Sequence, residues 1–486
     1  MKYLSLLLLW PLALPLVLAQ DEESNASNAK PVASPARSSY FTMKVEDLPR
    51  DAQGFLTTEV WDVIAEEAKA SPNGNEARLL KERPVNQAYY ATYAGWTPPP
   101  PLPVSEGRLR NLSETPTQPR FPITDKVWPS KPGDASVCLW EDDKLAAMSL
   151  GVDDNCASDL PFWKELSQKY GGLNITWNLI TCNIDGVLSK GRVVGAGTWD
   201  KWREMVKEGY HLASHSVTHN HAPVLSDGWP GPEWEAAESI RQIDSNIPGH
   251  RTRIYAYPGS GVRAFSTPRS LIASAYRPAL IKYYIGARGA GRNALNQANM
   301  IDYFNINAST GSVPFLLNND NPKLADQNLN NLFAADPQHP YHKYYRGWAN
   351  IFIHFINNGQ GWDEIPYNKA YAKVLEFYNQ NRDKLWTGFF DDIALYSQER
   401  DTSSVTMDEV TNDKIAFTLT SKMEPTIFDY PLTVKVRLPD QWKNVSAKLK
   451  DIDLPVQFLQ HEGAPYALVK VAPDRGQVVL APASAK

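Results

Sequence analysis

The chain has little cysteine, no marked excess of either charge and few long apolar runs. Only 3 of its 486 residues are Cys, so it is not one of the small secreted scaffolds held together by disulfides. A net charge of −5 and a pI near 6.0 give none of the positive surface that nucleic-acid binding requires. One apolar run approaches the ~20 residues that cross a bilayer, and two prolines interrupt it. We therefore expect no nucleic-acid partner and no membrane span.

Apolar and aromatic side chains are abundant by comparison. Hydrophobic residues make up 43% of the chain, which excludes a disordered protein, and the length predicts two or three domains with cores of their own. The 15 Trp, 22 Tyr and 16 Phe either fill those cores or line a site where sugar rings stack. Composition alone does not choose between these two uses.

Residues 1–19 have the pattern of a signal peptide. Lys2 supplies the positive start, an apolar run extends from Leu4 to Leu18, and Ala19 ends a small-residue cleavage site. The alternative is a membrane anchor, which the internal prolines disfavour. We expect a secreted protein, extracellular or periplasmic, whose mature chain starts at Gln20.

Export would permit one disulfide among the three cysteines. Cys156 and Cys182 flank the first strand–helix unit and form the favoured pair, which leaves Cys138 over. Three buried thiols are an equally good alternative.

The chain divides into three regions after the signal peptide. Residues 20–139 form an irregular, proline-rich N-terminal extension, with one helix over 55–70, that we expect to pack on the next domain. Residues 140–402 alternate strands and helices, which predicts an α/β fold with a parallel sheet or barrel and outer helices. The expected strands are 144–152, 175–181, 211–214, 253–257, 281–285 and 349–355, and the expected helices are 158–170, 198–207, 233–247, 269–276 and 368–382. Residues 403–486 contain only short strands and turns, typical of a small all-β sandwich.

Three groups of chemically capable residues follow predicted strands in the middle region. They are Asp153 and Asp154, then His215 and His219, then His354. Parallel sheets place their sites at the carboxyl ends of strands, so we expect these groups to meet. Each has a plain structural alternative: a turn or helix cap for the Asp pair, and a core histidine for His354. The spacing of His215 and His219 would put both rings on one face of a helical turn, a geometry that suits Zn²⁺.

The three groups together are more informative than each alone. One Asp and two His form a set of metal ligands that leaves positions for water and substrate. The other Asp is then free to act as a base, and the separate His as an acid. Metal-assisted hydrolysis requires these parts.

Residues 140–400 contain four motifs in a fixed order: Asp153-Asp154, His215-x-x-x-His219, a proline-containing strand end and a late apolar-x-His354. In this order of motifs the region resembles the polysaccharide deacetylases of the NodB-homology superfamily, carbohydrate esterase family 4 and its relatives. The resemblance implies a distorted (β/α)7 barrel and metal-dependent removal of acetyl groups from a polysaccharide or oligosaccharide. It assigns Asp153 as the base, Asp154, His215 and His219 as ligands of a divalent metal, preferably Zn²⁺, and His354 as the acid.

The resemblance also implies residues that contact the substrate. The backbone N–H of Gly259 would hold the oxyanion, Trp386 would wall the acetyl pocket, and Tyr257 lies beside them before the motif's proline. A core role for Trp386 remains the alternative.

The match departs from the family pattern at two positions. Where the family usually has a glycine after the paired Asp, this chain has Asn155. Where the family has the arginine that orients the base, this chain has Ala256. Arg288 is a candidate to supply the missing cation beside Asp153.

Two other functions stay open. The departures favour slightly a non-catalytic carbohydrate-binding protein on a diverged deacetylase scaffold. A hydrolase that cuts the glycan itself is the second, although adjacent carboxylates are poorly placed for it.

Overall fold

A computed structural model describes residues 49, 51, 56–72, 75–112, 116–186, 195–219, 228–258, 269–289, 294–310, 329–354, 356 and 366–483. The expected signal peptide and Gly259 lie outside these residues. Within the described part, no helix is long and apolar enough to cross a membrane.

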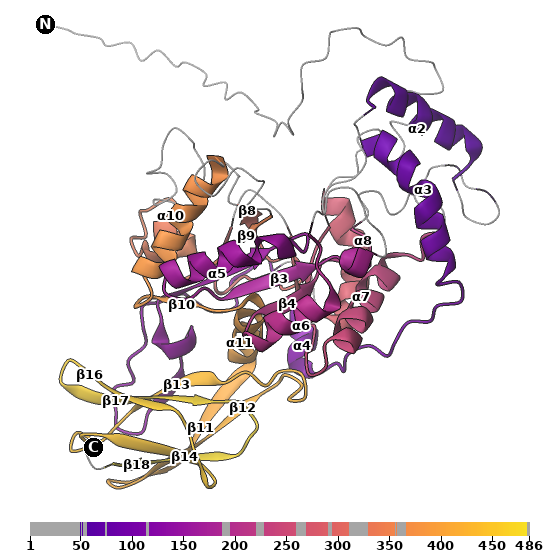
Figure 1. Ribbon diagram of the computed structural model, residues 1–486. Coiled ribbons are helices and arrows are strands. Elements are labelled where there is room, and N and C mark those ends of the chain that lie inside the picture. Colours follow the sequence, from indigo (N-terminus) through magenta and orange to yellow (C-terminus); the bar gives the residue numbers. More distant parts are fainter. Residues whose placement is uncertain are drawn as a thin grey trace, which may run out of the picture.

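A curled, mainly parallel sheet forms the centre of the molecule (Figure 1). One of its inner strands, β2 (Ala146–Val152), is buried at every residue, as expected for an apolar strand covered on both faces. The strand order is β6-β5-β4-β3-β2-β9-β7, and β10 and β8 pair beside it. The bounds are β3 Ile175–Leu179, β4 His211–Ser214, β5 Ile254–Ala256, β6 Gly286–Arg288, β7 Leu295–Asn296, β8 Ser309–Thr310, β9 Trp348–Ile353 and β10 Leu385–Thr387.

One segment joins the two sides of this sheet. Ala287 in β6 exchanges backbone hydrogen bonds with Tyr303 and Ile306, and a few residues later β8 pairs with β9. The sheet therefore curls toward closure, which agrees in outline with the expected barrel-like α/β fold. The short strand β7 departs from the parallel arrangement, because it pairs antiparallel with β9.

Helices pack against the sheet through tryptophan. Trp163 on α5 and Trp202 on α6 are fully buried, and both rings contact Trp177 of β3. Seven tryptophans are among the largest fully buried side chains, so much of the aromatic content fills the core. The bounds are α5 Leu160–Lys169, α6 Trp199–Lys207, α7 Pro232–Asn246, α8 Arg269–Tyr283, α10 Pro366–Gln380 and α11 Phe390–Thr402.

The prediction of a strand at 281–285 is wrong. Residues up to Tyr283 belong to α8, and the strand β6 begins at Gly286. The apolar run at 281–285 suits either structure, and here Tyr283 and Tyr284 reach the core from the end of a helix.

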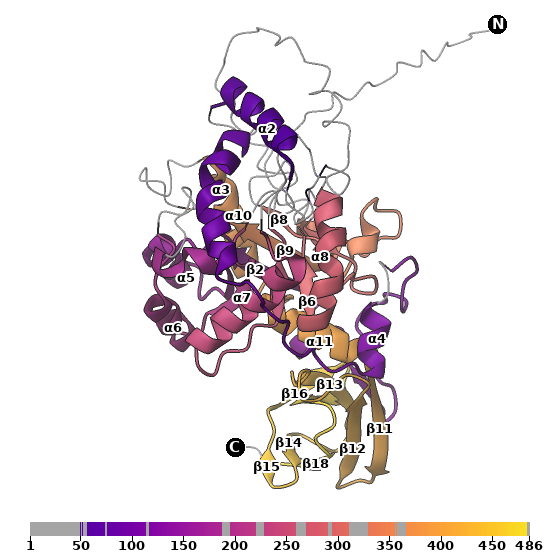
Figure 2. The same cartoon turned by 90° about the vertical axis from the view of Figure 1, so that its right-hand side faces the viewer.

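The N-terminal extension contacts both later regions. Its helices are α2 (Thr58–Ala70), α3 (Asn75–Ala91) and α4 (Glu106–Leu112), and α4 lies beside α11 (Figure 2). The N–H of Leu102 donates to the Lys282 carbonyl at 2.8 Å. Further along, β1 (Ala135–Val137) pairs antiparallel with β13 and so becomes a strand of a C-terminal sheet.

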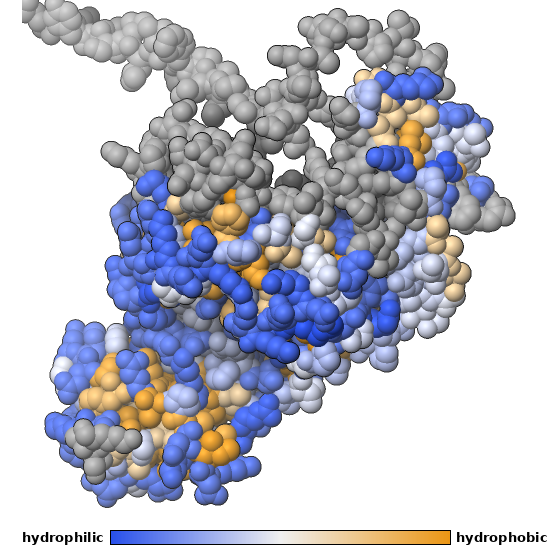
Figure 3. All heavy atoms as spheres, in the orientation of Figure 1, coloured by the Kyte–Doolittle hydropathy of each residue, from blue (hydrophilic) through white to orange (hydrophobic). Residues whose placement is uncertain are grey.

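Two antiparallel sheets form the C-terminal part of the chain, in the lower part of Figure 1. One has the order β1-β13-β17-β16 and the other β11-β12-β18-β14-β15. Phe417, Val434 and Val469, which come from both sheets, belong to one buried cluster. Hydrophobic residues also gather on the face of these sheets seen in Figure 3. The bounds are β11 Ser403–Val410, β12 Ile415–Ser421, β13 Leu432–Arg437, β14 Val445–Leu449, β15 Ile452–Asp453, β16 Val456–His461, β17 Ala464–Val471 and β18 Gln477–Pro482.

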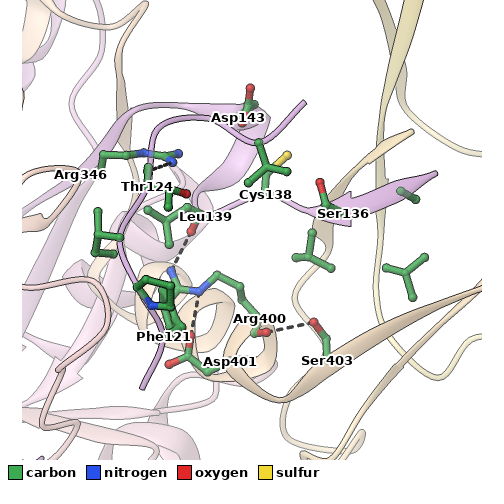
Figure 4. Close-up of a pocket in the computed structure, with 16 residues that line it drawn as sticks. Phe121, Thr124, Ser136, Cys138, Leu139, Asp143, Arg346, Arg400, Asp401 and Ser403 are labelled. Atoms are coloured by element: carbon green, nitrogen blue, oxygen red, sulfur yellow. Dashed lines mark hydrogen bonds and ion pairs between the residues drawn. The ribbon is translucent and has the colours of Figure 1, made fainter. Parts of the chain in front are cut away.

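A cavity of about 380 Å³ lies where the extension, the curled sheet and the C-terminal sheets meet (Figure 4). Arg400 on its wall donates to the Leu139 carbonyl and pairs with Asp401. Arg346 donates to the Thr124 carbonyl at 2.9 Å. These arginines bind backbone oxygens of the extension, so they fasten it to the rest of the molecule.

The cysteines do not form the favoured bridge. Cys138, Cys156 and Cys182 are buried thiols outside any disulfide. The Cys156 thiol donates to the Asp153 carbonyl at 3.1 Å instead.

Candidate metal site

The three expected groups meet at the carboxyl ends of neighbouring strands. Asp153 and Asp154 follow β2, His215 and His219 follow β4, and His354 follows β9. The strands β2 and β9 pair directly, while β3 separates β2 from β4. This order brings residues that are about 200 positions apart in sequence to one edge of the sheet.

Asp154 lies between the histidines. Its Oδ1 is 3.5 Å from His215 Nε2 and 3.6 Å from His219 Nε2. The two imidazole rings are 4.5 Å apart at 67°, so they converge on this oxygen from different directions. Burial alone would raise the pKa of Asp154, but His219, His215 and His354 outweigh it and lower the pKa.

The orientation of His215 leaves one ring nitrogen for a ligand. Its Nδ1 donates to the Ala256 carbonyl at 2.9 Å, which fixes the tautomer and turns Nε2 toward the carboxylates. A ligating histidine is commonly held in this way through its other nitrogen. Burial lowers the pKa of His215, but Asp153 and Asp154 raise it by more.

These residues fit a divalent metal ion. One ligand atom each from Asp154, His215 and His219 lies within 4.8 Å of the others. Asp154 Oδ1 is buried and has no hydrogen-bond partner, which is costly for a carboxylate oxygen unless a cation binds it. Two imidazoles and one carboxylate are ligands that suit Zn²⁺ and similar ions, although the set does not choose among them.

The segment from His215 to His219 is an irregular loop and not the expected helical turn. Ser216 and His219 have φ of 72° and 45°, outside the helical range. Serines build the loop, since Ser216 N–H donates to Ser214 Oγ and His219 N–H donates to Ser216 Oγ at 2.8 Å. The two rings still lie close together, with their centroids 4.5 Å apart.

A buried carboxylate on α7, that of Glu235, holds this loop through hydrogen bonds. Glu235 on α7 is 0% exposed and accepts from the N–H groups of Val217 and Thr218, at 2.9 and 3.0 Å. Its other oxygen accepts from the Thr218 hydroxyl and from Trp229 Nε1. Val217 and Thr218 lie between the two histidines of the loop, so Glu235 fixes the path of the chain from one metal ligand to the next.

Asp153 is held by a cation from a neighbouring strand. Arg288 Nη2 forms an ion pair with Asp153 Oδ1, and Asn178 Nδ2 donates to the same oxygen at 2.8 Å. Arg288 pairs in register with Ala256 across β5 and β6, so it lies next to the position where the resembled family has its arginine. Burial raises the pKa of Asp153, but Arg288, His215 and His354 together lower it. Arg288 therefore supplies the cation that the sequence led us to consider beside Asp153.

Asn155 has a conformational reason to replace glycine. Asp154, Asn155 and Cys156 have φ of 59°, 65° and 47°, and asparagine tolerates this left-handed region better than most residues. The Asn155 side chain accepts from the Ile180 N–H at 2.8 Å and donates to the Ile180 carbonyl at 3.2 Å. The side chain thereby ties the strained Asp loop to the end of β3.

His354 lies at the open side of the group. Its Nε2 is 4.0 Å from Asp154 Oδ2, and its side chain is 45% exposed, whereas that of His215 is 3% exposed. This exposure suits a residue that meets an incoming ligand.

The remaining candidates lie further from this group. The Tyr257 hydroxyl donates to the Phe304 carbonyl at 2.7 Å, and its ring packs in the core beside Tyr255. Gly259 is outside the described residues.

Trp386 has surroundings that favour its alternative role in the core. It pairs with Ala147, six residues before Asp153 on β2, which corresponds to about 20 Å along the strand. It packs there with Trp140 and Tyr396. A residue in this position is poorly placed to wall an acetyl pocket at the other end of the strand.

Three polar residues near the site were not predicted from the sequence. Asn178 and Glu235 are described above, and Tyr371 on α10 is fully buried with its hydroxyl unpartnered. Burial raises the pKa of Tyr371, and the Asp153 carboxylate adds to this effect. A polar residue inside the apolar run 175–179 was the available signal for Asn178, whereas nothing in the local pattern marks Glu235.

A second group of possible ligands lies at the opposite end of β4. His211, Asp391 and Asp392 come together there. His211 Nδ1 already hydrogen bonds to Asp391 at 2.8 Å, and its ring stacks on Phe389 at 3.7 Å. This arrangement fits a structural contact between β4 and the start of α11.

Comparison of sequences finds a relative among known proteins, although no family model matches the chain. A gellan lyase from a Bacillus species is 31% identical over 446 residues, which is 90% of this chain and 16% of that protein. The chain therefore spans about a sixth of the length of the curated relative that it matches.

Solved structures give only distant likenesses. A family 4 carbohydrate esterase from Bacillus anthracis has a TM-score of 0.27 at 11% identity, over 51% of this chain and 81% of its own. A CE4 family pseudoenzyme from the same organism has a TM-score of 0.28 at 13% identity, over 51% and 66%. Likenesses this distant do not establish a shared activity.

Proposed function

We propose that the chain is a secreted, metal-dependent deacetylase that hydrolyses acetyl groups from a polysaccharide or oligosaccharide. The observation that carries the proposal is the convergence of Asp154, His215 and His219 beside a second carboxylate, Asp153, which Arg288 holds. Hydrolysis of an ester or amide by a metal site requires this combination of ligands and a separate base.

Each residue has a role that follows from its position. Asp154, His215 and His219 would hold the metal, which when bound would polarise the acetyl carbonyl and acidify a water molecule. Asp153 Oδ2 takes the proton of the attacking water, because its Oδ1 is engaged by Arg288 and Asn178.

The exposed histidine completes the reaction. His354 donates a proton to the sugar oxygen or nitrogen as its bond to the acetyl carbon breaks. The water oxygen ends in acetate, and the sugar keeps the proton from His354. The proposal leaves the linkage open, since an ester and an amide need the same groups.

The substrate is a glycan in this proposal. The related gellan lyase is named for a polysaccharide, which makes acetylated gellan a reasonable first substrate. Secretion is proposed from the N-terminal sequence pattern, and it would give access to such polymers.

An acetate-release screen tests the proposal. Acetylated gellan, xylan, pectin and chitin are incubated with the protein, and bound metal is quantified in the same sample. We expect acetate release from at least one polymer, lost on chelation and restored by Zn²⁺ or another divalent ion. Absence of release from every polymer by a fully metal-loaded sample would contradict the proposal.

A second candidate is a carbohydrate-binding segment without catalysis. The observations that favour it are the departures from the family pattern at Asn155 and Ala256 and a sequence match to only 16% of a gellan lyase. In that case the protein binds the polymer and releases neither acetate nor shorter chains.

A further inference from the structure

A cavity of about 510 Å³ lies outside the metal site, where the end of α3 meets residues 228–230. Its wall includes the rings of Tyr90, Tyr93 and Trp96, together with Gln87 and Pro230. None of the described lining residues carries a charge. Tyr93 and Trp96 are half-buried, so part of each ring remains available to a ligand.

Neighbouring side chains hold these rings in place. The Tyr93 hydroxyl accepts from Gln242 Nε2 at 2.9 Å, and its ring packs edge-on against Trp234 at 4.9 Å. Gly95 has φ of 81°, a conformation that a residue with a Cβ rarely adopts, and the turn that it permits returns Trp96 to the end of α3. The cavity is therefore largely preformed.

The cavity and the metal site share one scaffold. Tyr90 and Trp234 pack in a buried cluster with Val217, which lies in the loop between His215 and His219. Glu235 accepts hydrogen bonds both from this loop and from Trp229, the neighbour of Pro230 on the cavity wall. The cavity wall and the loop between the two histidines are thus joined through one layer of buried side chains.

We propose that this cavity is a glycan subsite, which binds a sugar ring of the same polymer whose acetylated residue lies at the metal site. The proposal rests on the proposed function. The C–H face of a pyranose packs on flat aromatic rings, and its hydroxyls find partners in an amide and backbone oxygens. An uncharged, aromatic wall with few polar groups has this character.

Affinity electrophoresis tests the subsite. The protein is run through gels that contain gellan, xylan, pectin or glycol chitin, and retardation gives an apparent affinity. We expect Trp96→Ala to weaken binding about tenfold, which corresponds to about 1.4 kcal/mol, and Trp96→Phe to keep most of it. Tyr341→Ala is the matched control, because Tyr341 is an exposed aromatic residue, 45% exposed, outside this cavity.

Further measurements keep the result decisive. If Trp96→Ala does not fold, Trp96→Leu replaces it, since leucine keeps apolar contact without a flat ring. In the acetate assay the folded variant should raise KM with kcat unchanged. Unaltered retardation of Trp96→Ala or Trp96→Leu, or no retardation of the wild type by any polymer, would overturn the subsite. Retardation needs no catalysis, so its failure is distinguishable from failure to release acetate.

Discussion

Replacement of Glu235 by glutamine should weaken the metal site without touching a ligand. The carboxylate is 0% exposed and accepts from two backbone N–H groups, a hydroxyl and the Trp229 indole. Glutamine has one acceptor oxygen, so when it faces the two N–H groups its NH₂ group faces the Trp229 N–H. A buried donor left without a partner costs about 1–3 kcal/mol, and the remaining bonds lose their charge assistance.

We therefore expect Glu235→Gln to lower stability by about 3 kcal/mol. This corresponds to a fall of roughly 6–12 °C in the thermal midpoint for a domain of this size. Because the loop between His215 and His219 loosens, metal affinity should fall at least about tenfold, as it does when supporting contacts of metal ligands are removed. Differential scanning calorimetry and competition with a chelating dye give the two quantities.

Glu238→Gln is the matched control. Glu238 lies one turn further along α7 and is 1% exposed, but it bonds to Arg241 and Gln242 and not to the loop. Its replacement should cost stability and leave metal affinity unchanged. The reasoning is refuted if Glu235→Gln binds metal as the wild type does, or if both variants lose affinity equally.

Three further predictions concern other residues. Arg288→Met should destabilise the fold by about 3–5 kcal/mol in urea unfolding, because Asp153 is left buried without its cation. Adding Asp153→Asn to the same chain should recover part of that loss. Trp386→Ala should lower the free energy of unfolding by about 3–5 kcal/mol yet leave the KM of acetate release unchanged, since this residue packs far from the site. A raised KM would show instead that Trp386 contributes to the acetyl pocket. The third prediction concerns Asp392, whose pKa is raised to about 7 by burial and, to a lesser extent, by the neighbouring Asp391 carboxylate, against about 3.9 in an unfolded chain. The folded state holds this proton more tightly, so stability is lost as pH rises from about 4 to 7, and Asp392→Asn should be more stable than the wild type at pH 8 but equal to it near pH 4.

Local patterns predict much of the central sheet. The apolar run before Asp153 and the helical spacing around Trp163 correspond to β2 and α5. Both elements bury apolar side chains at regular intervals, so they can be recognised from the periodicity of apolar residues in the sequence. At 281–285 the same apolar residues fit two structures, and only packing against the core decides for a helix end.

Long-range pairing leaves no such mark. The strand β1 belongs to the C-terminal sheet although about 300 residues separate it from β13, and no local signal in the proline-rich extension identifies it. The strand β11 is not predicted either, because its core-facing apolar residues are few, Val405 and Met407, and both are only partly buried.

The site is partly predictable for a related reason. Asp153, Asp154 and the histidines stand at strand ends, and parallel topology brings such ends together. Their support by Glu235 depends on how α7 packs beneath the loop, which no local pattern marks. The irregular path from His215 to His219 was not predicted, since the spacing of two histidines is equally compatible with a helix.

Metal content of purified variants is the decisive measurement for the proposed site. We expect about one equivalent of divalent metal per chain in the wild type and in Asp391→Ala, and almost none in Asp154→Ala, with each sample shown to be folded. This result would assign the metal to the loops after β2 and β4. A full equivalent retained in Asp154→Ala, or its loss in Asp391→Ala, would contradict that assignment.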